Sequence, residues 1–302
     1  LAAVLAEHQA NVVRHEVFGS LAARAETLDL MRGLVGDLDW PVTWVDGASC
    51  GPGPLAGMHV LAVAGCPVET VRLGDGIVGR SFRDRWAKHL LLGAVKPSKA
   101  DQPKWIQARQ CFENLESALA AGGLGFAHVA RTWFFLDDIL SWYKPFNDVR
   151  TAFFREREVF ERLVPASTGV SGRNASGTAV VAGAWAAQPV DGAFPLREVE
   201  TPNQCPAPNY GSSFSRAVEL VTPDIRRLLV SGTASIAPDG QSVCPDDIDA
   251  QIDLTMDVIR AILVSRGLDF ADGSRVTAYF KHPKHAPVFD RWRSRLGLAE
   301  WP

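Results

Sequence analysis

Histidine and cysteine, the residue types that most often bind metals or act as nucleophiles, are scattered in this sequence. The seven histidines form no H-x-x-x-H pair and no acid-rich metal spacing. The five cysteines form no C-x-x-C pair, which is typical of reduced thiols rather than of disulfides or a zinc site. No phosphate-binding G-x-x-x-x-G-K-[ST] loop or dinucleotide fingerprint is present. We therefore expect no metal and no cofactor.

Arg131 and Arg275 stand at corresponding positions of an internal repeat. Residues 107–136 reappear as residues 251–280 with a constant shift of 144 positions. A residue that both copies retain more often serves the fold than catalysis, so we interpret both arginines as structural.

Each copy of the repeat predicts a helix followed by a strand. Apolar residues recur at three- and four-residue steps in the first part of each copy, as on a helix with one buried face. Residues 131–136 and 275–280 are rich in aromatic and β-branched residues and predict strands. The sequence thus predicts one α+β unit used twice.

The remaining elements are predicted from local patterns. Residues 1–36 are rich in Ala and Leu and predict one or two helices, and residues 68–74 and 89–95 predict strands separated by a polar segment, 79–85. Helices are expected at about 142–158 and 286–296.

Charge and hydrophobicity exclude two classes of partner. The net charge of −3 and the absence of a basic stripe give no reason to expect nucleic-acid binding. No apolar run approaches the roughly 20 residues that span a bilayer, so no membrane partner is expected. The reduced thiols and the lack of an export signal favour a cytoplasmic location.

The order of elements in both units resembles the Rid (YjgF) superfamily. The segments FSRAVEL (214–220) and LLVSGTASIAPDG (228–240) carry the resemblance. It implies an α+β fold of two tandem Rid-like (chorismate-mutase-like) units, with antiparallel or mixed sheets packed inward and helices outside. The chain then divides into a partial N-terminal segment (1–60, mostly helical), a degenerate first domain (61–188), a Pro-rich linker (189–209) and a second domain (210–302).

A chain with two such units is also similar to the chorismatases, which cleave pyruvate from chorismate. The segments YGSSFSRA (210–217) and VSGTASI (230–236) are similar to segments of that group. The resemblance implies that residues 1–60 complete a pseudo-trimer, and that the acidic catalytic residue lies on a strand beyond residue 302. Catalytic residues are therefore not assigned.

The resemblance also implies where substrate binds. Rid deaminases hold the substrate carboxylate with an arginine after Pro-Ala, where this chain has Ser167, and they position water with an acid on the closing strand, which here (178–187) has none. The first unit is therefore expected to lack deaminase activity of its own, and Arg173 is the candidate replacement guanidinium. The predicted substrate-binding residues are Phe214, Ser215, Gly232, Thr233, Ala234, Asn147, Ser167 and Arg173.

Simpler interpretations stay open for three of these residues. Arg173 lies in a Gly- and Asn-rich loop, where arginines are commonly solvated surface charges, and Asn147 can serve as a local hydrogen-bonding residue of its own turn. Gly232 also fits a strand end that needs unusual dihedral angles.

The sequence therefore predicts an enzyme that acts on a small anionic carboxylate in a cleft between the two units, as a monomeric pseudo-trimer or a homotrimer. Chorismatase-like hydrolytic release of pyruvate is the first choice. The alternatives are a RidA-like enamine/imine deaminase and a non-catalytic Rid homologue that binds small molecules.

Overall fold

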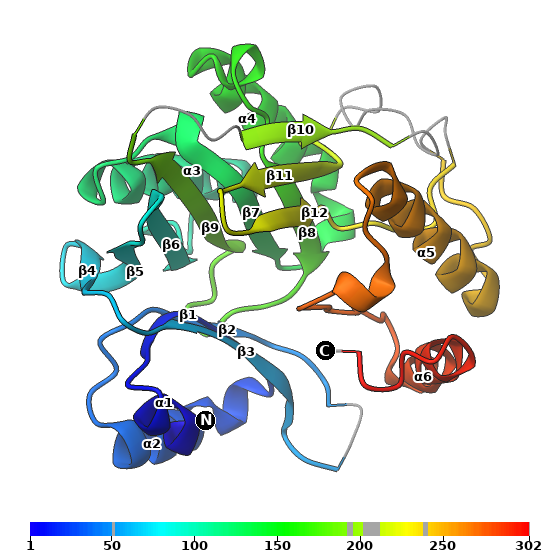
Figure 1. Cartoon of the computed structure of the whole chain (residues 1–302), viewed down its shortest axis with the longest axis horizontal. Helices are drawn as coiled ribbons and strands as arrows, with labels where there is room; N and C mark the ends of the chain where they lie inside the picture. The colour runs from blue at the N-terminus through cyan, green and yellow to red at the C-terminus, as the bar shows by residue number, and fades with distance from the viewer. Residues whose placement is uncertain (50–51, 192–195, 202–211, 238–240, 302) are drawn as a thin grey trace.

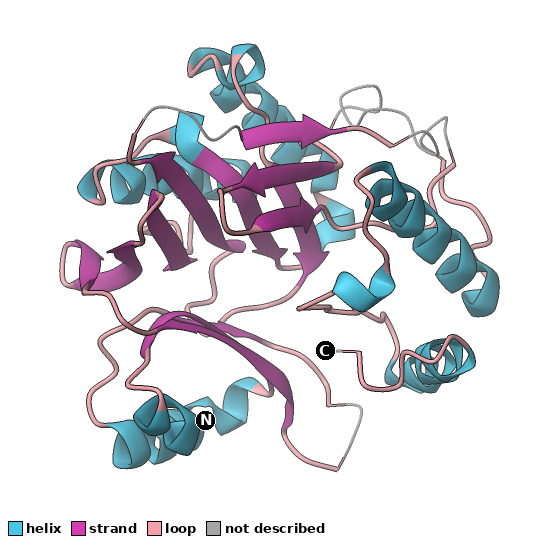
Figure 2. Ribbon diagram, in the orientation of Figure 1, coloured by secondary structure: helices cyan, strands magenta, loops and turns pink. Residues whose placement is uncertain are grey.

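The computed structural model describes residues 1–49, 52–191, 196–201, 212–237 and 241–301. Within these residues the chain forms three β-sheets at the centre of the molecule, with the helices at the periphery (Figure 1, Figure 2). The sheets are mixed or antiparallel. The predicted α+β class, with inward sheets and outer helices, is confirmed. In the described residues, no helix is both long and apolar enough to cross a membrane.

The N-terminal sheet is built around β1 (Asn11–Gly19). This strand pairs in parallel with β2 (Val42–Val45) and antiparallel with β3 (Leu55–Val63). Helices α1 (Ala2–Glu7) and α2 (Arg24–Val35) lie on its outer side (Figure 1).

The prediction of helices alone over residues 1–36 is wrong at β1. Arg14, His15 and Glu16 are consecutive residues of this strand, and all three are buried. A strand that buries charged residues does not show the apolar pattern from which strands are predicted.

The six-stranded central sheet has the order β4-β5-β6-β9-β7-β8. Its β7–β8 pair is parallel, and the other pairs are antiparallel. The strands are β4 (Val68–Leu73), β5 (Gly76–Arg83), β6 (Ala87–Val95), β7 (Val129–Leu136), β8 (Ala166–Ser171) and β9 (Val180–Pro189).

The segment that was expected to be a polar connection, 79–85, belongs largely to β5. Its polar residues Arg80 and Ser81 are buried. The guanidinium of Arg80 donates to the backbone oxygen of Asp39 at 2.7 Å. A residue distant in the sequence therefore accepts a hydrogen bond from the Arg80 guanidinium, a charged group that the local sequence pattern predicted to be exposed.

Helices α3 (Lys104–Ala121) and α4 (Tyr143–Glu156) cover one face of the central sheet. Phe112 of α3 packs against Phe134 of β7 and Phe153 of α4, with ring centroids 5.3 and 5.4 Å apart. These rings form the main apolar core, so the sheet and both helices fold as one body.

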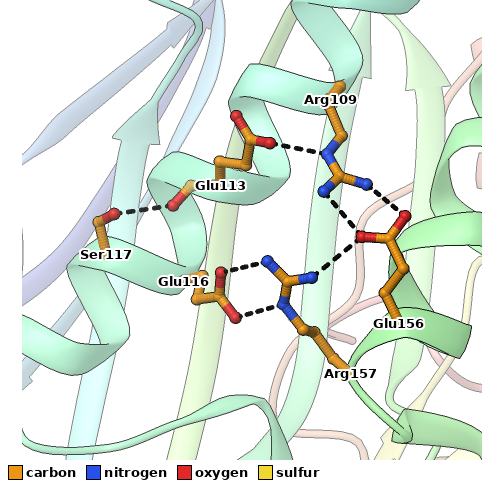
Figure 3. Close-up of polar contacts among 6 residues, drawn as sticks. All are labelled: Arg109, Glu113, Glu116, Ser117, Glu156 and Arg157. Carbon is orange, nitrogen blue, oxygen red and sulfur yellow. Dashed lines mark hydrogen bonds and ion pairs between the residues drawn. The ribbon is translucent and has the colours of Figure 1, made fainter.

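Ion pairs join α3 to α4 at the surface (Figure 3). Arg109 donates to Glu113 and Glu156, and Arg157 donates to Glu116 and Glu156. Single exposed ion pairs contribute little to stability, whereas several charges that form a network, as here, contribute more.

The chain after the central sheet forms a smaller sheet and two helices. Its strands are β10 (Leu196–Val199), β11 (Ala217–Val221) and β12 (Arg226–Val230), in that order. Its helices are α5 (Ile248–Ser265) and α6 (Ala286–Arg295). The segment expected to be a linker includes β10, which pairs with β11, and its residues 192–195 and 202–209 lie outside the described residues.

Each copy of the repeat begins with a helix, and the two helices carry a glutamine with the same role. Gln107 donates through Nε2 to the backbone oxygens of Ala100 and Gln102, and Gln251 donates in the same way to those of Cys244 and Pro245. Each glutamine thus fixes the chain that enters its helix.

The strand predicted at 275–280 is wrong for the described structure, because this segment forms no backbone ladder. Its side chains instead contact the N-terminal sheet: Arg275 pairs with Glu16 at 2.5 Å, and Thr277 lies 2.9 Å from His59.

Short 3-10 helices connect the elements at Leu21–Ala23, Phe126–His128, Ile139–Ser141, Val159–Glu161, Phe270–Asp272 and Pro283–His285.

Candidate active site between the central and C-terminal sheets

The backbone of β8 joins the central sheet to the second unit. The Ser215 N–H donates to the oxygen of Pro165 at 3.1 Å, and Ser215 forms a parallel bridge with Ala166. The Gly232 N–H donates to the oxygen of Ser167 at 2.9 Å. The start of β8 therefore lies between the segment that enters β11 and the segment that leaves β12.

The buried hydroxyl of Ser231 connects these three segments. Its Oγ accepts the Ser167 N–H at 2.8 Å and donates to the Ser215 oxygen at 2.5 Å. Thr233 continues the chain and donates through Oγ1 to the Ser231 oxygen at 3.0 Å. Ser231 thus fixes the backbone of several predicted substrate-binding residues.

Helix α4 borders this junction. The Thr151 and Ser213 hydroxyls lie 2.7 Å apart, and those of Tyr143 and Ser212 lie 3.4 Å apart. These contacts connect the first unit directly to the segment that precedes β11.

Two guanidinium groups flank the ring of Phe214. Those of Arg150 and Arg216 lie 5.5 and 5.6 Å from the Phe214 centroid, and both residues are buried. Arg150 Nη2 also donates to Asn147 Oδ1 at 2.5 Å. Two guanidinium groups beside one aromatic ring concentrate positive charge at this junction, and guanidinium groups form strong hydrogen bonds with carboxylates.

The structure brings most of the predicted site residues together. Ser167, Ser215, Gly232 and Thr233 meet through hydrogen bonds or through Ser231, and Ala234 follows directly in the chain. Phe214 and Asn147 join through Arg150. Sequence reasoning missed Arg150 and Arg216, although Arg216 lies inside the quoted FSRA segment and Arg150 follows Asn147 by one helical turn.

Arg173 lies apart from these residues. It follows the far end of β8, where its Nε donates to Asp46 Oδ2 at 3.0 Å and its backbone oxygen accepts the Asp46 N–H at 2.8 Å. Its side chain is 66% exposed. Its substrate-binding role stays a prediction, and Arg150 and Arg216 are the guanidinium groups beside the other predicted residues.

A carboxyl group lies just before the start of β8. Glu198 of β10 accepts the backbone N–H of Val164 at 2.7 Å. Burial raises the pKa of this carboxyl, an effect that the hydrogen bond from Val164 opposes and the neighbouring Glu200 reinforces.

Comparison with known proteins defines the class of fold. No protein-family model and no curated protein matches the sequence. The chain superimposes on a crystal structure of chorismatase with a TM-score of 0.67 and 17% identity, over 94% of this chain and 84% of that chain.

Shorter structures match less of the chain. TdcF from E. coli, solved with bound serine, gives a TM-score of 0.33 at 18% identity, over 39% of this chain and 92% of its own. The YjgF gene product from E. coli gives a TM-score of 0.31 at 22% identity, over 39% of this chain and 92% of its own.

The chain thus has an α+β fold of mixed and antiparallel sheets. Over nearly its whole length, this fold resembles that of chorismatase.

Proposed function

We propose that this protein catalyses a chorismatase-like reaction, the hydrolytic release of pyruvate from chorismate, at the junction of β8, β11 and β12. The similarity of fold to chorismatase over 94% of the chain is the main support. The meeting of both units at one set of predicted site residues is consistent with it.

In this proposal Arg150 and Arg216 bind substrate carboxylate. Both guanidinium groups are buried beside Phe214, where a carboxylate accepts charge-assisted hydrogen bonds in a low-dielectric setting. The Phe214 ring packs against the unsaturated ring of the substrate, and the buried hydroxyl of Ser231 holds the surrounding backbone in place.

The reaction needs a general acid. Protonation of the enol-ether methylene carbon produces an oxocarbenium ion, and addition of water gives a hemiketal that collapses to pyruvate and the ring alcohol. A carboxyl group with a raised pKa suits the protonation step.

Two features count against Rid-type deamination. Ser167 stands where Rid deaminases have an arginine, and β9 contains no acidic residue. Deamination of enamines and imines, or small-molecule binding without catalysis, are the alternatives that the activity assay separates.

The assay follows pyruvate formation from chorismate by the full-length protein, with a parallel enamine-hydrolysis assay. Pyruvate release with little enamine hydrolysis supports the proposal. Enamine hydrolysis without pyruvate release supports the deaminase, and chorismate binding without either reaction supports the binding protein.

We also propose that one chain closes a pseudo-trimer. Arg14 and Phe18 of β1, Arg131 and Phe135 of β7, and Arg275 and Tyr279 repeat one spacing, an arginine followed four residues later by an aromatic ring. Phe18 lies 5.7 Å from Phe135 and 5.9 Å from Tyr279, measured between ring centroids. A monomeric mass in solution supports this arrangement, and a stable homotrimer contradicts it.

A further inference from the structure

Three arginines gather where β1, β7 and the 274–280 segment meet, away from Phe214. The guanidinium carbons of Arg14, Arg131 and Arg275 lie 3.2, 5.1 and 5.8 Å from the centroid of the Trp133 ring. The side chain of Arg14 is 4% exposed and that of Arg275 is 35% exposed. The cluster is therefore buried at β1 and reaches solvent beside Arg275.

Negative charge in the cluster is too small to balance the arginines. Among the described residues, Glu16 is the one carboxylate that forms ion pairs with them, to Arg14 and to Arg275. Burial lowers the pKa values of the nearby His15 and His59 to about 4, so both are neutral at pH 7. Three guanidinium groups and one carboxylate give the cluster a net charge of +2, which is unfavourable where the groups are buried.

Arg131 has an unused hydrogen-bond donor. Its Nη2 donates to Thr168 Oγ1 at 2.6 Å, while Nη1 is buried and has no partner in the described structure. Burial and then the charge of Arg14 lower the pKa of Arg131 to about 9, so the group stays protonated at pH 7. A buried charged donor without an acceptor is destabilising.

We propose that this three-arginine cluster, Arg14, Arg131 and Arg275, binds a small oxyanion of the carboxylate or phosphate class. Arg131 Nη1 donates to one anion oxygen, and the anion supplies the missing negative charge. Planar guanidinium groups match both oxyanions, because each presents paired donors to paired oxygens. The anion enters beside Arg275 and Tyr279. The Tyr279 residue is 42% exposed.

This site is separate from the proposed active site but adjoins it through Thr168. That residue accepts from Arg131, and a Cβ atom placed on Gly232 would lie 3.2 Å from its Oγ1. Bound anion is therefore positioned to affect the start of β8.

The test titrates inorganic phosphate and, separately, acetate into the full-length protein at an ionic strength held constant with sodium chloride. Calorimetry gives the affinity and thermal unfolding gives the Tm. We expect saturable binding and a rise in Tm beyond that in chloride alone. Tighter binding of phosphate identifies a phosphate-type ligand, and tighter binding of acetate a carboxylate.

Variants test the location. Arg131→Met and Arg275→Met should each weaken binding by about tenfold or more, as expected for loss of a charge-assisted hydrogen bond. Glu16→Gln should strengthen binding, because it removes the competing carboxylate. The control Arg32→Met changes an arginine of α2 whose side chain is 51% exposed, and should leave binding unchanged.

Unchanged affinity in Arg275→Met overturns the proposal even if Arg131→Met or Glu16→Gln fails to fold, because Arg275 lies at the partly exposed edge of the cluster. Equal effects of oxyanions and chloride on the wild-type protein overturn it as well. Neither result depends on pyruvate release, so failure of this inference is distinguishable from failure of the proposed reaction.

Discussion

The Ser167 backbone N–H donates to Ser231 Oγ at 2.8 Å, across the junction of the two units. Ser167 is the second residue of β8 in the first unit, and Ser231 follows β12 in the second. The same hydroxyl donates to the oxygen of Ser215, so one small side chain holds three segments of the proposed active site.

Ser231→Ala should destabilise the protein. It leaves a buried N–H and a buried carbonyl without their present partner, which costs about 1–3 kcal/mol. Urea unfolding followed by circular dichroism measures the change. The control Ser117→Ala removes an exposed hydroxyl on α3 and should alter the free energy of unfolding by less than ~0.5 kcal/mol. Equal effects of the two substitutions would show that Ser231 does not join the segments.

Substitutions at two glycines should have opposite effects on stability. A Cβ on Gly232 would lie 3.2 Å from Thr168, so Gly232→Val should crowd the junction and destabilise by about 1–3 kcal/mol. Gly33 lies within α2 and a Cβ there would meet no atom within 4 Å, so Gly33→Ala should stabilise by about 0.5–1 kcal/mol. Thermal unfolding of both variants provides the comparison, and a stabilising Gly232→Val would contradict the close packing of β8 and β12.

Glu16→Gln should destabilise the fold strongly. The substitution leaves the buried Arg14 without its counter-charge, a change that typically costs about 3–5 kcal/mol when a buried pair is broken. Glu113→Gln is the control, because Glu113 pairs with Arg109 at the surface and should contribute less than ~1 kcal/mol. Denaturant unfolding near pH 7 measures both, and similar small losses would mean that the cluster does not stabilise the sheet contact.

Acid should destabilise the protein through Glu16 as well. Burial raises the pKa of this carboxyl, but the charges of Arg14 and Arg275 outweigh burial and lower it overall. A folded-state pKa below the unfolded value gives stability that is complete above the unfolded pKa and is lost as pH falls toward the folded value. Unfolding free energies measured below pH 5 should therefore fall less steeply in Glu16→Gln than in the wild type. Parallel pH curves would contradict the ion pairs.

His15 should contribute a pH dependence at higher pH. Burial lowers its pKa from 6.5 to about 4, and its Nδ1 accepts the Trp40 indole N–H at 3.3 Å. The unfolded chain binds this proton more readily, so stability should rise as pH increases from about 4 to 6.5, by at most ~1.4 kcal/mol per pH unit. His15→Phe should reduce the slope over this window. An unchanged slope would mean that His15 titrates alike in both states.

The sequence was most informative where apolar periodicity was strong. The expected helices at about 142–158 and 286–296 correspond to Tyr143–Glu156 and Ala286–Arg295. The repeated helices carry the same glutamine contacts at Gln107 and Gln251. Local patterns determine such elements, because their buried faces are apolar.

Prediction failed where buried groups are polar and their partners lie far along the chain. The strand Asn11–Gly19 buries Arg14 and Glu16, and Glu16 is balanced by Arg275, 259 positions away. The guanidinium groups beside Phe214 were also missed, because Arg150 and Arg216 meet only through folding. No local sequence pattern shows that a buried charged residue has its partner far along the chain.

The most direct test of the account measures kcat/KM for pyruvate release from chorismate in the full-length wild type, Arg150→Met and Arg155→Met. Arg150 is buried beside Phe214, whereas Arg155 is an exposed residue of the same helix. The account predicts release by the wild type, a loss of about tenfold or more in Arg150→Met, and wild-type values in Arg155→Met. Absence of pyruvate release by the wild type, or full activity in a folded Arg150→Met protein, would contradict it.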